Sequence, residues 1–186
     1  FDKLTDSIQQ ALLSPLGYPG KTYGGIQIAI EDTRMPPYAI ELQRSGTDNN
    51  NLRYAGGDAT LRVGGESLLD GVDWASGGAL DWATGSLQVA DAGAVLAGDT
   101  VHLTATDAGL TLNDARVIAD RDLTLSADNG DIRTGGGEQQ TVTSRDGDVT
   151  VSTGRTLDNQ GDIKAGNGRV DATGSEGVNN AGAIAA

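Results

Sequence analysis

A spacing of 21 to 26 residues recurs along most of this chain and restricts its possible folds more than any other feature. The repeat is plainest near the end, where residues 157–166 (LDNQGDIKAG) are matched 21 positions later by residues 178–186 (VNNAGAIAA). Strands are expected to begin at one fixed point of every repeat, at Ala59, Leu80, Val101, Leu123, Val149 and Val170, with offsets of 21, 21, 22, 26 and 21 residues. The spacing therefore predicts six turns of one structural unit.

Within each repeat, apolar and polar residues alternate over short segments. Val101, Leu103 and Ala105 alternate with His102 and Thr104, a period of two that is typical of a strand with one buried face. Second strands are expected to begin at Leu87, Leu110, Ile132, Leu157 and Val178. Third strands are expected around Trp74, Val95, Val117, Val142, Ile163 and Ile184. The pattern places every strand in register with its equivalent one repeat later.

These repeats contain no run of helical periodicity, so they indicate a β-solenoid rather than an array of helices. One repeat alone cannot bury its apolar face, whereas parallel stacking at roughly 4.8 Å per turn pairs each strand above and below. We therefore expect an all-β protein with a parallel β-helix over residues 58–186. The chirality of parallel crossovers favours a right-handed coil.

Residues 1–57 do not fit the repeat, and we interpret them as a short non-repetitive α+β segment. Leu4, Ile8 and Leu12 have the spacing of a short amphipathic helix, and alternating strands are expected over residues 26–30 and 38–42. The segment either covers the open end of the solenoid and protects its unpaired backbone, or binds a partner, as non-repeated insertions on rigid scaffolds often do.

All four tyrosines of the chain lie in this segment. They are Tyr18, Tyr23, Tyr38 and Tyr54. Because aromatic side chains are enriched at protein contact surfaces, these are the candidate recognition residues.

Three features mark particular repeats. Trp74 and Trp82 occupy positions filled by Val or Leu in neighbouring repeats, which predicts that both fill the core. About four extra residues around residues 135–140 are expected to leave the coil as a surface loop. Asn159 and Asn180 share a register and are expected to form a short internal amide ladder.

Glycine and aspartate together mark the corners of the repeat, as in Gly57-Asp58, Gly98-Asp99 and Gly147-Asp148. At such corners glycine permits a tight turn, and the aspartate is expected to bond its own backbone. The acidic groups resemble calcium ligands in type, but neither a twelve-residue calcium loop nor a glycine-rich nonapeptide is present. Corner turns are the simpler interpretation, and we predict no metal and no cofactor.

Charge and composition narrow the possible partners. The formal net charge is −13, and a carboxylate-rich surface repels nucleic acid and acidic membranes. The chain lacks cysteine, which excludes disulfides and thiol chemistry. Phe1 in place of an initiating methionine, and a final repeat that stops at Ala186, lead us to expect a segment of a longer chain.

Little in the sequence points to an enzyme. The single histidine, His102, lies on the polar face of its strand, and no G-x-S-x-G motif is present, so no nucleophile–base pair can be assembled. A β-helix can cleave polysaccharides with carboxylates across a groove, yet no outward cluster of Asp with Lys, Arg or aromatic residues on adjacent turns is recognised. We expect no catalytic activity, and keep a carbohydrate-active enzyme on acidic polysaccharide as the alternative.

The last two repeats carry a family resemblance. The pattern Leu157-x-Asn159-x-Gly161-x-Ile163-x-Ala165-Gly166, followed by Val178-x-Asn180-x-Gly182-x-Ile184, resembles the haemagglutinin repeat of filamentous haemagglutinin-type exoproteins. That family includes adhesins and the CdiA-type effectors of contact-dependent growth inhibition. The resemblance covers roughly residues 58–186 and is weaker in the first two repeats.

This resemblance implies a long right-handed parallel β-helix, secreted through a dedicated outer-membrane partner transporter and displayed at the cell surface as a filament. It also implies a receptor protein or glycan on a host cell or a neighbouring bacterium, and a monomer within a longer filament. The family has no catalytic residues in its repeats. From the resemblance we expect a stalk and possible cell-contact region, with residues 1–57 as the candidate recognition element.

Overall fold

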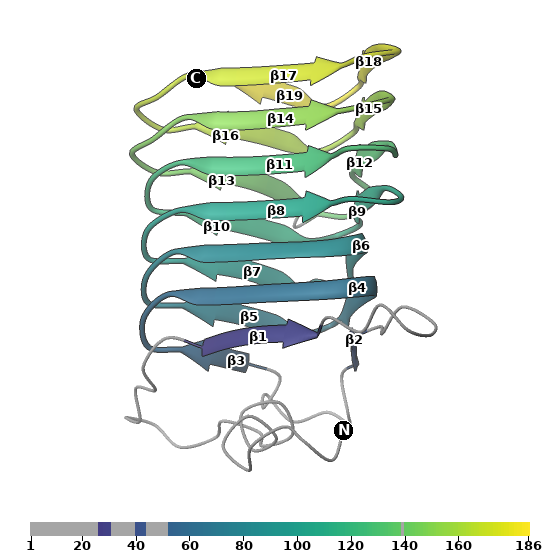
Figure 1. Cartoon of the computed structure of the whole chain (residues 1–186). Helices are drawn as coiled ribbons and strands as arrows, with labels where there is room; N and C mark the ends of the chain where they lie inside the picture. Colours follow the sequence, from purple (N-terminus) through teal and green to yellow (C-terminus); the bar gives the residue numbers. More distant parts are fainter. Residues whose placement is uncertain (1–25, 31–39, 44–51, 139) are drawn as a thin grey trace.

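The chain folds into a stack of parallel β-strand coils. The computed structural model describes residues 26–30, 40–43, 52–138 and 140–186. In these residues the chain winds as a right-handed coil in which each turn lies on the one before (Figure 1), and neighbouring turns pair in parallel. The predicted all-β parallel β-helix is confirmed. No helix in the described part of the chain is long and apolar enough to cross a membrane.

The strands form three rows that run along the stack. The first row contains β1 (Ile26–Ile30), β4 (Ala59–Asp70), β6 (Leu80–Ala90), β8 (Val101–Ala105), β11 (Leu123–Ala127), β14 (Val149–Thr153) and β17 (Val170–Gly174). The second row contains β2 (Ile40–Gln43), β9 (Leu110–Leu112), β12 (Ile132–Thr134), β15 (Thr156–Asn159) and β18 (Gly177–Asn180). The third row contains β3 (Leu52–Ala55), β5 (Asp73–Ser76), β7 (Ala94–Ala97), β10 (Arg116–Ala119), β13 (Thr141–Ser144), β16 (Asp162–Ala165) and β19 (Ala183–Ala185).

The first two rows belong to one sheet and the third row to another. Among the described residues these sheets have 12 and 7 strands. The rows join because β4 and β6 run through both of them, so that β6 pairs with β8 through Leu80–Thr84 and with β9 through Leu87–Val89. In later turns the corner separates the two rows into distinct strands.

The register follows the predicted repeat. Leu61, Trp82 and Leu103 lie above one another in the first row, and Trp74 lies beneath Val95 in the third. The predicted strand starts from Ala59 to Val170 are confirmed.

Strands β1, β2 and β3 lie within residues 1–57, yet they pair in parallel with β4 and β5. The two strands expected after residue 25 are therefore present, and each of them pairs with β4 rather than with the other. In the described residues the stacking thus begins before residue 58. The helix expected around Leu4 to Leu12 lies outside the described residues, and the division into residues 1–57 and 58–186 stays a prediction.

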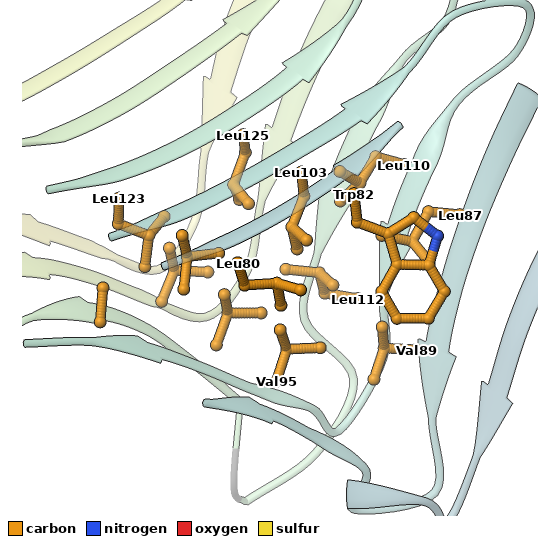
Figure 2. Close-up of a cluster of buried hydrophobic side chains, with 14 of the residues drawn as sticks. Leu80, Trp82, Leu87, Val89, Val95, Leu103, Leu110, Leu112, Leu123 and Leu125 are labelled. Carbon is orange, nitrogen blue, oxygen red and sulfur yellow. The ribbon is translucent and has the colours of Figure 1, made fainter. Parts of the chain in front are cut away.

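The interior is filled by the inward faces of all three rows. Figure 2 shows Leu103, Leu112 and Val95, one from each row, directed toward a common interior, and all three are at most 1% exposed. Full burial of one Leu, Val or Ile side chain contributes about 1.5–3 kcal/mol, so a continuous file of them along the stack supplies the main stabilisation. In the last turn, the inward positions Val178 and Ile184 are 42% and 36% exposed because no turn covers them here.

Both tryptophans lie in this core, as predicted. Trp82 is fully buried and packs edge-on against Trp74, with ring centroids 5.3 Å apart. The indole Nε1 of Trp82 donates to Ser67 Oγ at 3.3 Å, and Ser67 lies 2.8 Å from the hydroxyl of Thr84. This small buried network satisfies the polar groups beside a register shift in β4.

An amide ladder runs through the upper corner of the second row. Asn159 is fully buried; it accepts from the Thr134 hydroxyl below and donates to Asn180 Oδ1 above at 2.7 Å. Its Nδ2 also lies 3.1 Å from the carbonyl of Gly161. The predicted Asn159–Asn180 ladder is confirmed, with Thr134 as an additional member.

The aspartates at the first-row corners correct one expectation. Asp58 Oδ1 accepts from the backbone N–H of Ala79 at 2.9 Å, and Asp148 Oδ1 accepts from that of Arg169 at 2.8 Å. These carboxylates therefore bond the backbone one turn further on, instead of their own. Gly78 faces the Asp58 carboxylate. This contact requires glycine there, since a Cβ on Gly78 would lie 2.1 Å from Asp58 Oδ1.

Candidate binding groove

The candidate recognition residues are only partly described. Tyr18, Tyr23 and Tyr38 lie outside the described residues. Tyr54 belongs to β3, where its backbone pairs beside Ala75 of β5. Their role in recognition stays a prediction, and the described surface has to be searched for other sites.

The insertion after β12 forms a loop whose last residue belongs to the interior. Between the paired positions of β12 and β13 lie residues 135–140, whereas the next turn has only Gln160 and Gly161 between Asn159 and Asp162. Gly136, Gly137 and Glu138 are exposed, as expected for a loop that leaves the coil. Gln140 is only 7% exposed, however, and its Oε1 accepts from the backbone N–H of Ala115 at 3.1 Å, so it takes part in the packing between turns.

A polar groove lies where the first and second rows meet. Its volume is about 390 Å³, and it extends across five turns, from Glu66 of β4 through β6, β9 and β12 to Arg155 after β14. Figure 1 shows the loops after β8 and β11 projecting beyond the corner at which β4 and β6 turn from the first row into the second without a break. The groove is therefore bounded by projecting corners along the later turns.

One side of the groove is a column of outward side chains from the second row. Gln88, Thr111 and Arg133 pair above one another in β6, β9 and β12. All three line the groove, while their inward neighbours Leu87, Leu110 and Ile132 are buried in the core. Successive side chains of a strand point to opposite faces of the sheet. Because their neighbours point into the core, Gln88, Thr111 and Arg133 face outward.

The other side is formed by the corner loops. Asp107 to Gly109 and Asn129 to Asp131 contribute to it. Asn129 Nδ2 donates to the carbonyl of Thr106 at 2.7 Å, which ties the upper of these two corners to the lower one.

Two arginines converge on one carboxylate at the upper end of the groove. Arg133 Nη2 lies 2.9 Å from Asp131 Oδ2, and Arg155 Nε lies 3.9 Å from Asp131 Oδ1. Arg155 is also 3.7 Å from Glu176 Oε2 of the turn above. The Asp131 side chain is 22% exposed, whereas those of Arg133 and Arg155 are 63% and 55% exposed. Asp131 therefore holds two guanidinium groups that keep most of their N–H donors toward solvent.

Asp131 is itself held by the backbone. Its Oδ1 accepts from the N–H of Thr156 at 3.2 Å, the same contact to the next turn that Asp58 and Asp148 make at the first-row corner. This fixes the carboxylate between the two arginines.

This grouping corrects the expectation that no outward cluster of acidic and basic residues lies on adjacent turns. At the fixed repeat spacing, the residue stacked above Arg133 is Asp158 and not Arg155. The repeat alone therefore does not bring the two arginines together. Arg155 reaches the site because it is in the corner loop, beside Thr156, whose N–H caps Asp131. The repeat offset does not predict this contact, because Arg155 follows Asp131 by 24 residues, whereas the paired residues of β12 and β15 are 25 apart.

Other exposed ion pairs lie away from the groove. Arg121 Nη2 donates to Asp99 Oδ2 of the adjacent turn at 2.6 Å. This hydrogen bond holds the pKa of Asp99 below its ordinary value and raises the pKa of Arg121. His102 is exposed on the outer face of β8, as predicted.

The described residues contain no group of three or more His, Cys, Asp or Glu side chains arranged to hold a metal ion. The groove is lined by neutral hydrogen-bonding side chains, by the carboxylates of Glu66, Asp107 and Asp131, and by two guanidinium groups. Comparisons with family models, curated proteins and solved structures gave no match.

Proposed function

We propose that this chain is a structural segment of a large secreted filamentous exoprotein, acting as a stalk and as a possible cell-contact region. The resemblance of residues 157–184 to the haemagglutinin repeat motivates this family assignment. The proposal includes display at the cell surface, export through an outer-membrane partner transporter, and contact with a receptor protein or glycan.

The observation that carries the proposal is the continuous ladder of strands around a closed apolar core. Leu80, Leu103, Leu125 and Val151 are fully buried, so the interior of these turns is occupied by the protein's own side chains. Each turn bonds its neighbours along all three rows, which favours a stiff rod. Any recognition by such a rod takes place on its outer surface.

An enzyme acting on acidic polysaccharide is the second candidate. Its support is the groove, which places the carboxylates of Glu66, Asp107 and Asp131 along one surface. Paired carboxylates are the usual catalytic groups of glycoside hydrolysis. Against it, both oxygens of Asp131 are already engaged, Oδ2 by Arg133 and Oδ1 by the Thr156 N–H.

The test is binding of the fluorescently labelled chain to intact bacterial cells and to intact epithelial cells. Saturable binding to one cell type supports a contact region and distinguishes growth inhibition from host adhesion. Saturable binding to neither cell type contradicts a contact role and leaves the stalk.

The enzyme is tested separately by incubating the chain with an acidic polysaccharide and measuring released oligosaccharides. Release that is lost in Asp107→Asn or Glu66→Gln would establish the enzyme and contradict a purely structural role.

A further inference from the structure

We propose that the groove between the first and second strand rows binds a carboxylate-bearing oligosaccharide, with Arg133 and Arg155 holding a carboxylate of the ligand. This inference deepens the proposed cell-contact function and rests on it for its biological meaning. Binding of the oligosaccharide depends only on the groove and can be tested without the cell-contact function.

The arginine pair is unusual on this surface. The chain has 13 Lys and Arg residues against 26 Asp and Glu, yet two guanidinium groups meet at one carboxylate beside the groove. Asp131 offers its oxygens to both arginines and to a backbone N–H, so it cannot engage all their donors. Arginine has five N–H donors in a planar fork suited to carboxylates. Arg155 also pairs with Glu176, yet the side chains of Arg133 and Arg155 are still 63% and 55% exposed, which leaves donors for a carboxylate of the ligand.

The rest of the groove suits hydroxyl groups. Below the arginines it presents the side chains of Ser86, Gln88 and Thr111, which both donate and accept hydrogen bonds. The carboxylate of Glu66 lies at its lower end and that of Asp107 in its middle turn, and ionised carboxylates accept strongly from hydroxyl donors. A hydroxyl-rich oligosaccharide that presents one of its carboxylates to the arginines matches these side chains.

The shape of the groove also matches a chain-like ligand. It crosses five turns, from β4 to the corner after β14, and successive turns are about 4.8 Å apart. A ligand lying parallel to the solenoid axis would therefore meet several equivalent positions in succession.

An extended acidic peptide fits less well. Peptides commonly bind by adding a strand to a free sheet edge, but β9 and β12 are each paired with a strand on both sides. Their backbone offers no free edge at the groove, and most of the side chains that line it are polar.

The experiment uses the full chain and two-dimensional NMR, with hexagalacturonate as the probe. Its fully methyl-esterified form, which keeps most hydroxyls but lacks carboxylates, and a hexaglutamate peptide serve as comparison ligands. The variants are Arg133→Gln with Arg155→Gln, and, as a matched control, Arg121→Gln, an exposed arginine that pairs with Asp99 outside the groove. Thermal melts verify that all variants remain folded.

The proposal predicts that hexagalacturonate shifts the amide signals of Gly109, Asp131 and Arg133. The double variant should weaken binding at least about tenfold, as expected when charge-assisted hydrogen bonds are lost. Arg121→Gln should bind as the unaltered chain does, and the methyl ester should bind at least about tenfold more weakly than the acid.

Several results would overturn the proposal. They are shifts confined to residues outside the groove, no binding at all, equal loss in Arg121→Gln and the double variant, or equal binding of the methyl ester. Equal binding of hexaglutamate would overturn the ligand class and point to an acidic peptide.

The same variants separate this proposal from the proposed function. If the labelled double variant still binds cells as the unaltered chain does, the groove is not the contact site, while the contact role stands. If the groove binds hexagalacturonate but the chain binds no cell, the contact role fails and the binding site stands.

Discussion

Replacing Leu125 with alanine should destabilise the stack strongly, because this side chain lies in the middle of the core. Leu125 is fully buried in β11, between Leu103 of β8 and Val151 of β14. Three carbons are removed, each contributing about 0.8 kcal/mol of transfer free energy. A residual cavity of roughly 40–80 Å³ would add about 1–2 kcal/mol at about 24 cal/mol per Å³. We therefore expect a loss of about 3–4 kcal/mol in the free energy of unfolding.

Urea unfolding followed by far-ultraviolet circular dichroism measures this loss through the transition midpoint and its slope. Thr124→Ala is the matched control, since Thr124 lies on the same strand and is only half-buried; a change within about 0.5 kcal/mol is expected. Leu125→Asp should be worse than Leu125→Ala, because it places a charge in the apolar core. Equal effects of Leu125→Ala and Thr124→Ala would refute the assignment of inward and outward faces.

Three further changes test the contacts between turns. Asn159→Ala should cost about 2–4 kcal/mol in urea unfolding because it leaves buried partners unsatisfied, whereas exposed Asn179→Ala should change stability by less than about 0.5 kcal/mol. Gly78→Ala should displace the carboxylate that caps the next turn and lower the melting temperature by about 2–4 °C, with no change counting against the cap. Arg121→Leu should raise the pKa of Asp99 toward its ordinary value in an NMR titration, and an unchanged pKa would contradict the pairing.

The Asp99–Arg121 pair also has a defined pH dependence. Because folding lowers the pKa of Asp99, the pair stabilises the fold above the unfolded pKa of this carboxyl, and that contribution is lost as the pH falls through the folded pKa. Arg121→Leu should therefore reduce stability near neutral pH more than in acid.

The strand positions were predictable because the repeat is a property of the sequence itself. In a solenoid each turn contacts only its neighbours, so register follows directly from the offset between equivalent residues. Leu61, Trp82 and Leu103 could therefore be stacked without any knowledge of the structure. The stacking of β1, β2 and β3 was harder to predict, since the chain between these strands breaks the spacing.

The groove could not be predicted from the repeat in the same way. Strand residues keep their alternation, and so Gln88, Thr111 and Arg133 could be assigned to the outer face. The corner loops, in contrast, differ in length and path from turn to turn. The approach of Arg155 to Asp131 depends on that path, and it does not follow from a fixed offset.

The most direct test of the account is the distance between two nitroxide spin labels at opposite ends of one outward column. Thr60, Asp81, His102, Thr124, Thr150 and Asp171 lie in register along the first row. The chain has no native cysteine, so labels introduced by Thr60→Cys and Asp171→Cys are unambiguous. Five steps of about 4.8 Å predict a narrow distribution of distances near 24 Å between the labelled backbones. A broad distribution, or a mean distance far from this value, would contradict one coil per repeat and with it the rigid rod on which both functional proposals depend.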